Sequence, residues 1–225
     1  MRHVLAGVLI ALLVCSLLWA ALPFTDTFTA ADGTSLATYN ANWTVVTSTM
    51  GIFGNATGCT AGSSCLAKDN SNTYNSNQIA TGTLKTPSAG TYTGVAINMT
   101  TGDNGYQCRA DDNELTMLRR GTTSTLWSAT TPTILDGDVI SLWRNGNNVY
   151  CELTRSGVSQ YASGPVADTT HTGGSPGIGG FGWVSSSTYT RIDDVTLNDY
   201  SGGGGSAPIR RRPIMMFFTL PEFAR

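Results

Sequence analysis

The acidic side chains are the first residues in this sequence whose chemistry suggests a reaction, because cleavage of a glycosidic bond uses two carboxyl groups that flank the bond. Between the apolar N-terminus and residue 202 there are only two glutamates, Glu114 and Glu152, in different segments. The adjacent aspartates form two pairs, Asp111-Asp112 and Asp193-Asp194. Neighbouring side chains in a strand point to opposite faces. No local pattern therefore joins two carboxyl groups, although aspartates from distant strands could still meet.

Nucleophilic catalysis by a Ser/His/Asp triad would have to use His171, the only histidine after the apolar N-terminus. This histidine lies in a segment rich in threonine and glycine, where a hydrogen bond that stabilises a turn is the simpler role. We therefore predict no catalytic residues and expect that the protein is not an enzyme.

Sugar recognition suits the remaining residues best, because aromatic faces stack on the C–H surfaces of a sugar ring while amide and carboxylate groups bind its hydroxyls. We predict that the ligand-binding residues are five aromatic residues in outward-facing positions or loops and one turn asparagine: Tyr106, Trp127, Trp143, Trp183, Tyr189 and Asn145. The alternative for each aromatic residue is burial in the core, where Trp and Tyr of sandwiches often lie.

Four cysteines remain when Cys15 of the N-terminal segment is set aside, and an even number is typical of an exported protein with disulfides. Cys59 and Cys65 bracket a short loop, which favours a bridge between them. Cys108 and Cys151 lie at apolar positions of two strand-like segments, so a buried bridge between them is geometrically feasible. The alternative is that these two are reduced core residues.

Short alternating segments separated by turn residues must position these side chains. A hairpin is indicated most clearly by residues 139–144 and 149–154, which flank the turn sequence Asn145-Gly146-Asn147-Asn148. Residues 95–99 predict a half-buried strand because apolar and small or polar residues alternate there. Further strands are predicted at residues 106–110, 114–120, 124–129, 178–184 and 189–197.

The composition also favours strands and excludes one class of partner. Charged residues make up 12% of the chain, and its 26 glycines indicate many turns. The net charge of −2 gives no electrostatic basis for binding nucleic acid. We predict an all-β protein with an antiparallel two-sheet sandwich, for which a jelly roll is the best architecture.

The two ends of the chain differ from this domain, which we place at residues 22–200. Residues 1–21 combine a positive start with an apolar run, and predict a signal peptide or a signal-anchor helix. This segment implies a protein that is secreted or membrane-anchored, with the domain outside the cytoplasm and membrane contact only through residues 1–21 if they are retained. Residues 201–208 form a glycine-rich linker, and 209–225 a basic and apolar tail that is either a docking segment or a frayed end.

The beginning and end of the domain resemble the concanavalin A-like (laminin G-like) jelly-roll modules of secreted microbial and phage-associated proteins. Asp26-Thr-Phe-Thr-Ala-Ala-Asp-Gly followed by Asn42-Trp43 is similar to their first strand, and His171-Thr-Gly-Gly-Ser-Pro-Gly followed by Arg191-Ile-Asp-Asp is similar to their last. The resemblance covers residues 24–197 and implies that these end segments adjoin. The E-x-D-x-x-E motif of the laminarinase-like members is absent.

A calcium ion is a further expectation from this resemblance, since such modules often hold their first and last strands together with an ion bound by oxygen ligands. The candidate ligands are Asp26, Asp32, Asp193 and Asp194. The alternative is that Asp32-Gly33 is a turn and that the other two are ordinary edge charges.

Three functions are consistent with the sequence. The leading hypothesis is a non-catalytic module that binds a glycan or surface polysaccharide at a cell or particle surface. The second is a structural or adhesive surface domain, such as a phage-type decoration module, with a protein partner. The third is a glycoside hydrolase without the usual signature. The fold alone does not choose among them, because this fold supports all three.

Overall fold

A computed structural model describes the chain over residues 22–60, 64–130, 132–182 and 184–202. The predictions made for residues 1–21 and 209–225, and for most of the linker, lie outside these ranges. Within the described ranges no helix has the length and apolar character needed to cross a membrane.

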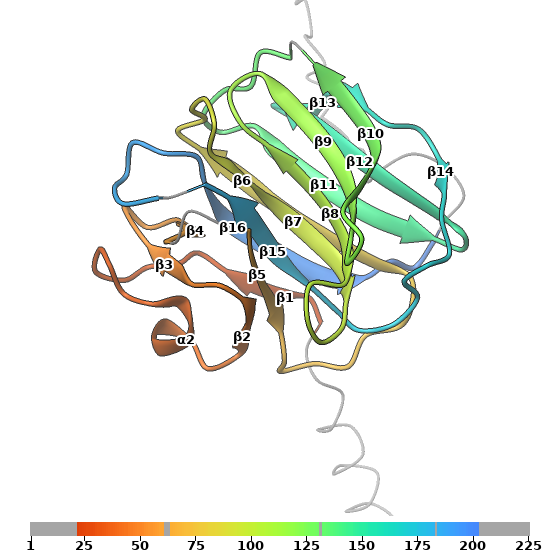
Figure 1. The fold of residues 1–225 in the computed structure, drawn as a ribbon, viewed down its shortest axis with the longest axis horizontal. Coiled ribbons are helices and arrows are strands. Elements are labelled where there is room, and N and C mark those ends of the chain that lie inside the picture. The colour runs from red at the N-terminus through yellow and green to blue at the C-terminus, as the bar shows by residue number, and fades with distance from the viewer. Residues whose placement is uncertain (1–21, 61–63, 131, 183, 203–225) are drawn as a thin grey trace, which may run out of the picture.

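Two antiparallel sheets lie face to face and form a sandwich, as Figure 1 shows. The nine-stranded sheet has the order β13 (Val158–Ala162), β12 (Asn148–Arg155), β11 (Val139–Asn145), β6 (Gln78–Lys85), β16 (Arg191–Asp199), β4 (Thr57–Cys59) and β3 (Met50–Ile52). Its other two strands are β1 (Phe24–Asp26), which pairs with β16, and β14 (Val166–Ala167), which pairs with β12. The prediction of an all-β, two-sheet sandwich is confirmed.

The second sheet has seven strands and lies in front in Figure 1. Its order is β10 (Ser124–Thr130), β9 (Glu114–Arg120), β8 (Gly105–Ala110), β7 (Tyr92–Met99), β15 (Ser175–Phe181), β5 (Cys65–Asp69) and β2 (Trp43–Thr47). One short helix, α2 (Leu36–Tyr39), precedes β2. Because β7 and β15 are neighbours, residues about 80 positions apart in the sequence meet in the middle of this sheet.

β11 and β12 form the hairpin that the sequence predicts. Asn145 pairs with Asn148, so the connection is a two-residue turn. Gly146 opens this turn with φ of +58°, a value that glycine adopts without steric cost. The strand predicted at residues 178–184 starts and ends earlier, as β15, because Gly182 has φ of +97° and breaks the extended run.

β7 is more buried than the sequence predicts. The alternation suggests a half-buried strand, but every residue of β7 after Tyr92 is buried. Val95 and Ile97 point into the core, while Ala96 packs on the outer face with Leu66. β7 lies between β8 and β15, so side chains from neighbouring strands reach across its outer face.

Both predicted disulfides are present, and both join the two sheets. Cys59 in β4 is bonded to Cys65 in β5, and Cys108 in β8 is bonded to Cys151 in β12. Each pair is buried in the core between the sheets. The alternative of reduced core cysteines at the second pair is therefore excluded by the structure.

The first and last strands of the domain are adjacent, as the family resemblance implies. Phe24 of β1 pairs with Leu197 of β16, and Asp26 pairs with Val195. Both strands send apolar side chains into the core.

Candidate functional site

The outer face of the seven-stranded sheet is defined by the alternation of β8. Tyr106, Cys108 and Ala110 belong to the core between the sheets. Gln107 and Arg109 therefore lie on the opposite, outer face of the same strand. These two polar side chains are the starting point of the candidate site.

Residues with little or no side chain lie next to this polar pair. Arg109 pairs with Gly94 and Gln107 pairs with Ala96 on β7. On the adjoining strand β15, glycine residues pair with both Gly94 and Ala96. Side chains from neighbouring strands can therefore extend over this strip, and its residues on β7 and β15 are buried beneath them.

Arg109 extends over the strip toward two aromatic rings on the neighbouring strands. Its guanidinium carbon lies 4.7 Å from the ring centroid of Tyr92 and 5.7 Å from that of Phe181. The two rings are paired across β7 and β15, with centroids 6.5 Å apart. Phe181 is 43% exposed, so the group offers an exposed aromatic ring beside a cation.

Glu114 supplies a carboxylate at the end of this group. Tyr92 Oη donates a 2.8 Å hydrogen bond to Glu114 Oε2, and Thr116 Oγ1 donates to Glu114 Oε1. The hydrogen bond from Thr116 is the main reason that the pKa of Glu114 lies below its ordinary value, and the bond from Tyr92 and the charge of Arg109 act in the same direction. Glu114 is therefore an ionised hydrogen-bond acceptor at neutral pH.

Gln107 is fully buried, yet neither polar atom of its side chain has a hydrogen-bond partner in the described part of the chain. Glycine at position 179 makes room for it, because a Cβ there would lie 2.9 Å from Gln107 Nε2 and 2.4 Å from Leu66 Cδ2. An unsatisfied buried amide costs about 1–3 kcal/mol. A buried polar group of this kind is commonly satisfied by a water molecule or a ligand.

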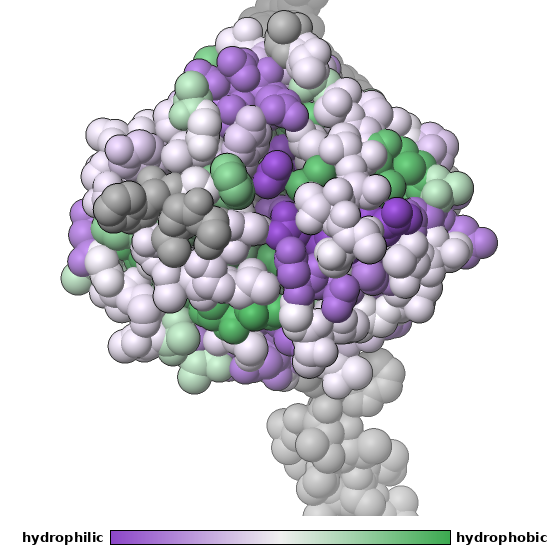
Figure 2. All heavy atoms as spheres, viewed as in Figure 1, coloured by the Kyte–Doolittle hydropathy of each residue, from purple (hydrophilic) through white to green (hydrophobic). Residues whose placement is uncertain are grey.

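Arg120 closes the other end of the polar row. Its guanidinium binds Asp103 with N···O distances of 2.7–2.9 Å and also donates to Ser64 Oγ. Ser64 precedes Cys65, so the Cys59–Cys65 disulfide fixes the chain next to this face. Figure 2 views the same face and shows hydrophilic residues gathered through its middle.

The predicted outward placement of Tyr106 is wrong. Tyr106 is fully buried, and its Oη donates a 2.7 Å hydrogen bond to Asp168 Oδ1. It has the same parity in β8 as Cys108, which the sequence places in the core. The same parity would have directed attention to Gln107 and Arg109, which sequence reasoning missed.

Trp127 and Trp143 also offer little surface to a ligand. Trp127 is partly buried and packs against the core. Trp143 is only 8% exposed, because it stacks on Tyr150 at 5.0 Å with near-parallel rings and lies 6.5 Å from the ring of Tyr200. Asn145 lies in the same strand as Trp143, on the nine-stranded sheet, so neither belongs to the face that carries Arg109.

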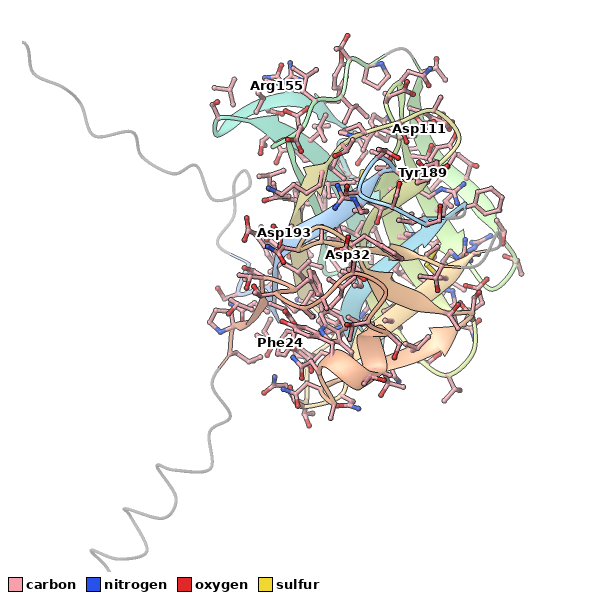
Figure 3. The ribbon with its side chains drawn as sticks, turned by 90° about the vertical axis from the view of Figure 1, so that its left-hand side faces the viewer. Phe24, Asp32, Asp111, Arg155, Tyr189 and Asp193 are labelled. Carbon is pink, nitrogen blue, oxygen red and sulfur yellow. A yellow bond between two sulfur atoms is a disulfide. The ribbon has the colours of Figure 1, made fainter. Side chains whose placement is uncertain are left out.

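The remaining two predicted aromatic residues have different outcomes. Tyr189 is 36% exposed and precedes β16. Figure 3 places it near Asp111 and far from Phe24. Trp183 lies outside the described residues. Among the predicted ligand-binding residues that the structure describes, none forms a ring contact or hydrogen bond with Arg109, Tyr92 or Phe181.

The four aspartates predicted to bind calcium do not form a metal site. The carboxylate of Asp26 accepts hydrogen bonds from the backbone N–H of Phe28, Tyr39 Oη, Asn40 Nδ2 and Trp43 Nε1, at 2.7–3.1 Å. Its oxygens are therefore occupied by protein donors. Nowhere in the described ranges do three or more acidic, histidine or cysteine side chains come together as metal ligands.

The other three predicted calcium ligands also have protein-based roles or positions. Asp32 accepts a 2.7 Å hydrogen bond from the backbone N–H of Gly54. Asp193 Oδ2 lies 3.8 Å from Lys85 Nζ, and the next residue, Asp194, is exposed with φ of +47°. Figure 3 shows Asp32 and Asp193 on the same side of the molecule. This geometry does not support the calcium site that the resemblance implies.

Replacing Asp193 with asparagine is expected to stabilise the protein at neutral pH. Burial is the main cause that raises the pKa of Asp193, and the negative charges of Asp194 and Asp26 raise it further, against the opposing effects of a hydrogen bond from the backbone N–H of Asp194 and of the charge of Lys85. A raised pKa means that the ionised side chain destabilises the folded state once the pH exceeds the ordinary value of about 4. Urea unfolding should show a higher free energy of unfolding for Asp193→Asn than for the wild type at pH 7, and no difference near pH 3.

Asp32→Asn is the control for this experiment, because Asp32 is exposed. It should change the free energy of unfolding little at either pH. A loss of stability in Asp193→Asn at pH 7 would show that the ion pair with Lys85 outweighs burial.

His171 joins its loop to strands β8 and β9, whereas the sequence predicts a hydrogen bond within a local turn. One ring nitrogen lies 3.1 Å from the carbonyl oxygen of Arg120, and its backbone N–H donates to Tyr106 Oη. Residues 173–177 read G-G-S-P-G, which fits the letters of a G-x-S-x-G nucleophile motif. Ser175 nevertheless begins strand β15 and pairs with Met99, whereas a nucleophile elbow is a strand–turn–helix.

Comparison with known proteins identifies the fold but no sequence family. No protein-family model matches the chain, and no curated protein matches it. Among solved structures it is similar to the carbohydrate-binding module CBM66 from Bacillus subtilis, with a TM-score of 0.52 and 11% identity over 70% of this chain and 96% of that chain.

The exoplasmic/lumenal domain of VIP36 is similar to a comparable degree. Its Ca2+/Man3GlcNAc-bound form has a TM-score of 0.51 and 6% identity over 73% of this chain and 86% of that chain. Its Ca2+-bound form has the same TM-score and 5% identity over 80% of this chain and 90% of that chain. At these identities the likenesses establish that the chain shares a lectin-like β-sandwich fold.

Proposed function

We propose that this protein is a non-catalytic carbohydrate-binding module that binds a glycan on the outer face of its seven-stranded sheet. The observation that carries the proposal is the group formed by Phe181, Tyr92 and Arg109. An exposed aromatic ring beside hydrogen-bonding groups is the arrangement that sugar rings and their hydroxyls require. Glu114 supplies an acceptor at its edge.

The fold supports the same class of function. One similar structure is named as a carbohydrate-binding module, and another is described with Man3GlcNAc bound. We take a glycan or surface polysaccharide as the partner and propose that residues 1–21 export the domain. Calcium is left out of the proposal, because the four candidate aspartates do not fit an ion.

The chemistry of the site favours binding over hydrolysis. A general acid in a glycosidase needs a raised pKa so that it carries a proton to the leaving group. The pKa of Glu114 is lowered instead. Asp111, its acidic neighbour, accepts hydrogen bonds from the backbone N–H groups of Asn113 and Glu114, a structural role in the turn between β8 and β9.

Replacing Phe181 with alanine is expected to weaken glycan binding by about tenfold, because the exposed ring supplies the stacking surface. Binding is measured on an array of plant, bacterial and animal polysaccharides, with affinity electrophoresis of the purified protein for each polysaccharide that binds. Protein-coated spots without sugar provide the blank.

Leu135→Ala and Val158→Ala are the matched controls, because both side chains are large and exposed and neither lies on the strands that carry Phe181, Tyr92 and Arg109. Neither change should alter glycan binding by more than about twofold, because residues outside the contact contribute little to affinity. Absence of binding to every polysaccharide would overturn the proposed function. Loss of binding in Leu135→Ala or Val158→Ala with retention in Phe181→Ala would place the site elsewhere.

A further inference from the structure

Arg109 differs from the other arginines of the described chain because its guanidinium has neither a hydrogen-bond acceptor nor an ion-pair partner. The ion pairs formed by arginine join Arg119 to Asp168, Arg120 to Asp103 and Arg155 to Asp138. The guanidinium groups of Arg144 and Arg191 donate to backbone carbonyl groups. For Arg109, no described residue accepts a hydrogen bond or forms an ion pair.

Glu114, the carboxylate of the candidate site, does not form an ion pair with Arg109. It accepts from Tyr92 and Thr116, and no ion pair joins it to Arg109. Arg109 Nε is buried without a partner. Arg109 as a whole is half-buried, so the two terminal nitrogens of its guanidinium are the part that a ligand can reach.

The surroundings of Arg109 make an anion more favourable there than water. Burial is the main cause that lowers the pKa of Arg109, and the positive charge of Arg120 lowers it further, against the opposing effects of Tyr92, Glu114 and Asp111. The net lowering means that these acidic groups do not offset the burial of the positive charge, which a bound anion would relieve. Tyr92 and Phe181 hold the guanidinium in place, so little side-chain freedom is lost when a ligand binds.

Gln107 is the second, independent indication of a ligand at this position. It lies two residues from Arg109 on the same face of β8, and both polar atoms of its buried side chain are unpaired. The amide can donate to one oxygen of a ligand and accept from a hydroxyl. A carboxylate-bearing sugar presents both groups on one ring.

We infer that the glycan bound on this face is acidic, and that Arg109 binds its carboxylate or sulfate group through the terminal guanidinium nitrogens. Phe181 stacks on this sugar, and Gln107, which is fully buried without ligand, reaches the sugar from below when the side chains over its amide move aside. This inference rests on the proposed function and adds the chemical class of the ligand. It also accounts for an arginine held between two rings without a protein acceptor.

The test uses pairs of polysaccharides that differ only in the acidic group. The probes are polygalacturonate, alginate and hyaluronate, each with free and with methyl-esterified carboxyl groups, and dextran with and without sulfate. The protein should bind at least one acidic member about tenfold more tightly than its neutral counterpart. Comparison of the carboxylate and sulfate pairs then identifies which anion is recognised.

Arg109→Gln should remove that preference and weaken binding to the acidic member by about tenfold or more. Arg109→Lys keeps the charge but not the planar fork, and should recover only part of the affinity. Lys68→Gln is the matched control, because Lys68 lies on β5 of the same sheet and its loss changes the net charge equally. It should leave the preference intact.

The outcomes separate the two proposals. Equal binding to acidic and neutral members, or binding to neutral members alone, would overturn the acidic ligand and leave the carbohydrate-binding function standing. Binding to no polysaccharide at all would overturn both. An equal loss of affinity in Lys68→Gln and Arg109→Gln would show that the preference depends only on the net charge of the protein. This result would contradict the specific role of Arg109. Circular dichroism of each variant verifies that it is folded.

Discussion

Replacing both Cys108 and Cys151 with alanine is expected to lower the free energy of unfolding by about 4 kcal/mol. This disulfide joins β8 to β12 across the core and spans 43 residues of sequence. A cross-link that closes a long loop removes more conformational freedom from the unfolded chain than one that closes a short loop, and the chain-entropy relation gives about 4 kcal/mol for this length. Urea unfolding followed by tryptophan fluorescence measures the change.

The second disulfide is the natural control. Cys59 and Cys65 are six residues apart, and they are also buried between the two sheets. Their replacement by alanine creates similar local cavities but opens a much shorter loop, for which the same relation gives about 2 kcal/mol. Equal losses in the two double variants would show that local packing, not loop length, determines the contribution of these bridges.

Replacing Asp26 with alanine is expected to destabilise the protein by about 3 kcal/mol. Its carboxylate accepts hydrogen bonds from four donors, among them Trp43 Nε1 at 2.7 Å and the backbone N–H of Phe28 at 2.9 Å. Both of these donors belong to buried residues and would lose their acceptor. An unsatisfied buried donor costs about 1–3 kcal/mol, and the variant creates at least two.

Asp32→Ala provides the comparison, because Asp32 is exposed and accepts a single hydrogen bond from Gly54. Its loss should cost less than about 1 kcal/mol. Both measurements are made by urea unfolding with calcium and again with EDTA. A wild-type protein whose stability falls in EDTA, combined with an Asp26→Ala variant that EDTA does not affect, would instead indicate that Asp26 binds an ion and would contradict its assignment as a hydrogen-bond acceptor alone.

Local sequence patterns predict those parts of the fold in which neighbours in sequence are also neighbours in space. The β11–β12 hairpin is of this kind, since Asn145, Gly146 and the flanking apolar alternation determine it together. The two disulfides also follow from local features, namely a short loop and the parity of two strands. The burial of both faces of β7 does not follow from local patterns, because the side chains that cover its outer face, Leu66 and Gln107, come from other strands.

The candidate site was not predictable by the same reasoning. Tyr92, Arg109 and Phe181 come together only because β7 pairs with β8 on one side and with β15 on the other. Phe181 is 72 residues from Arg109 in sequence, and no local spacing links them. Residue type alone does not separate the exposed Phe181 from the buried Tyr106 and Trp143.

The pairing of β1 with β16 has a consequence for how this domain can be combined with others. Phe24 lies opposite Leu197, so the chain enters and leaves the sandwich at neighbouring points. A domain whose ends are adjacent can be inserted into a surface loop of a host protein without separating the two halves of that loop. The same proximity of the ends makes circular permutation geometrically feasible, with the old ends joined and new ends opened at an exposed turn.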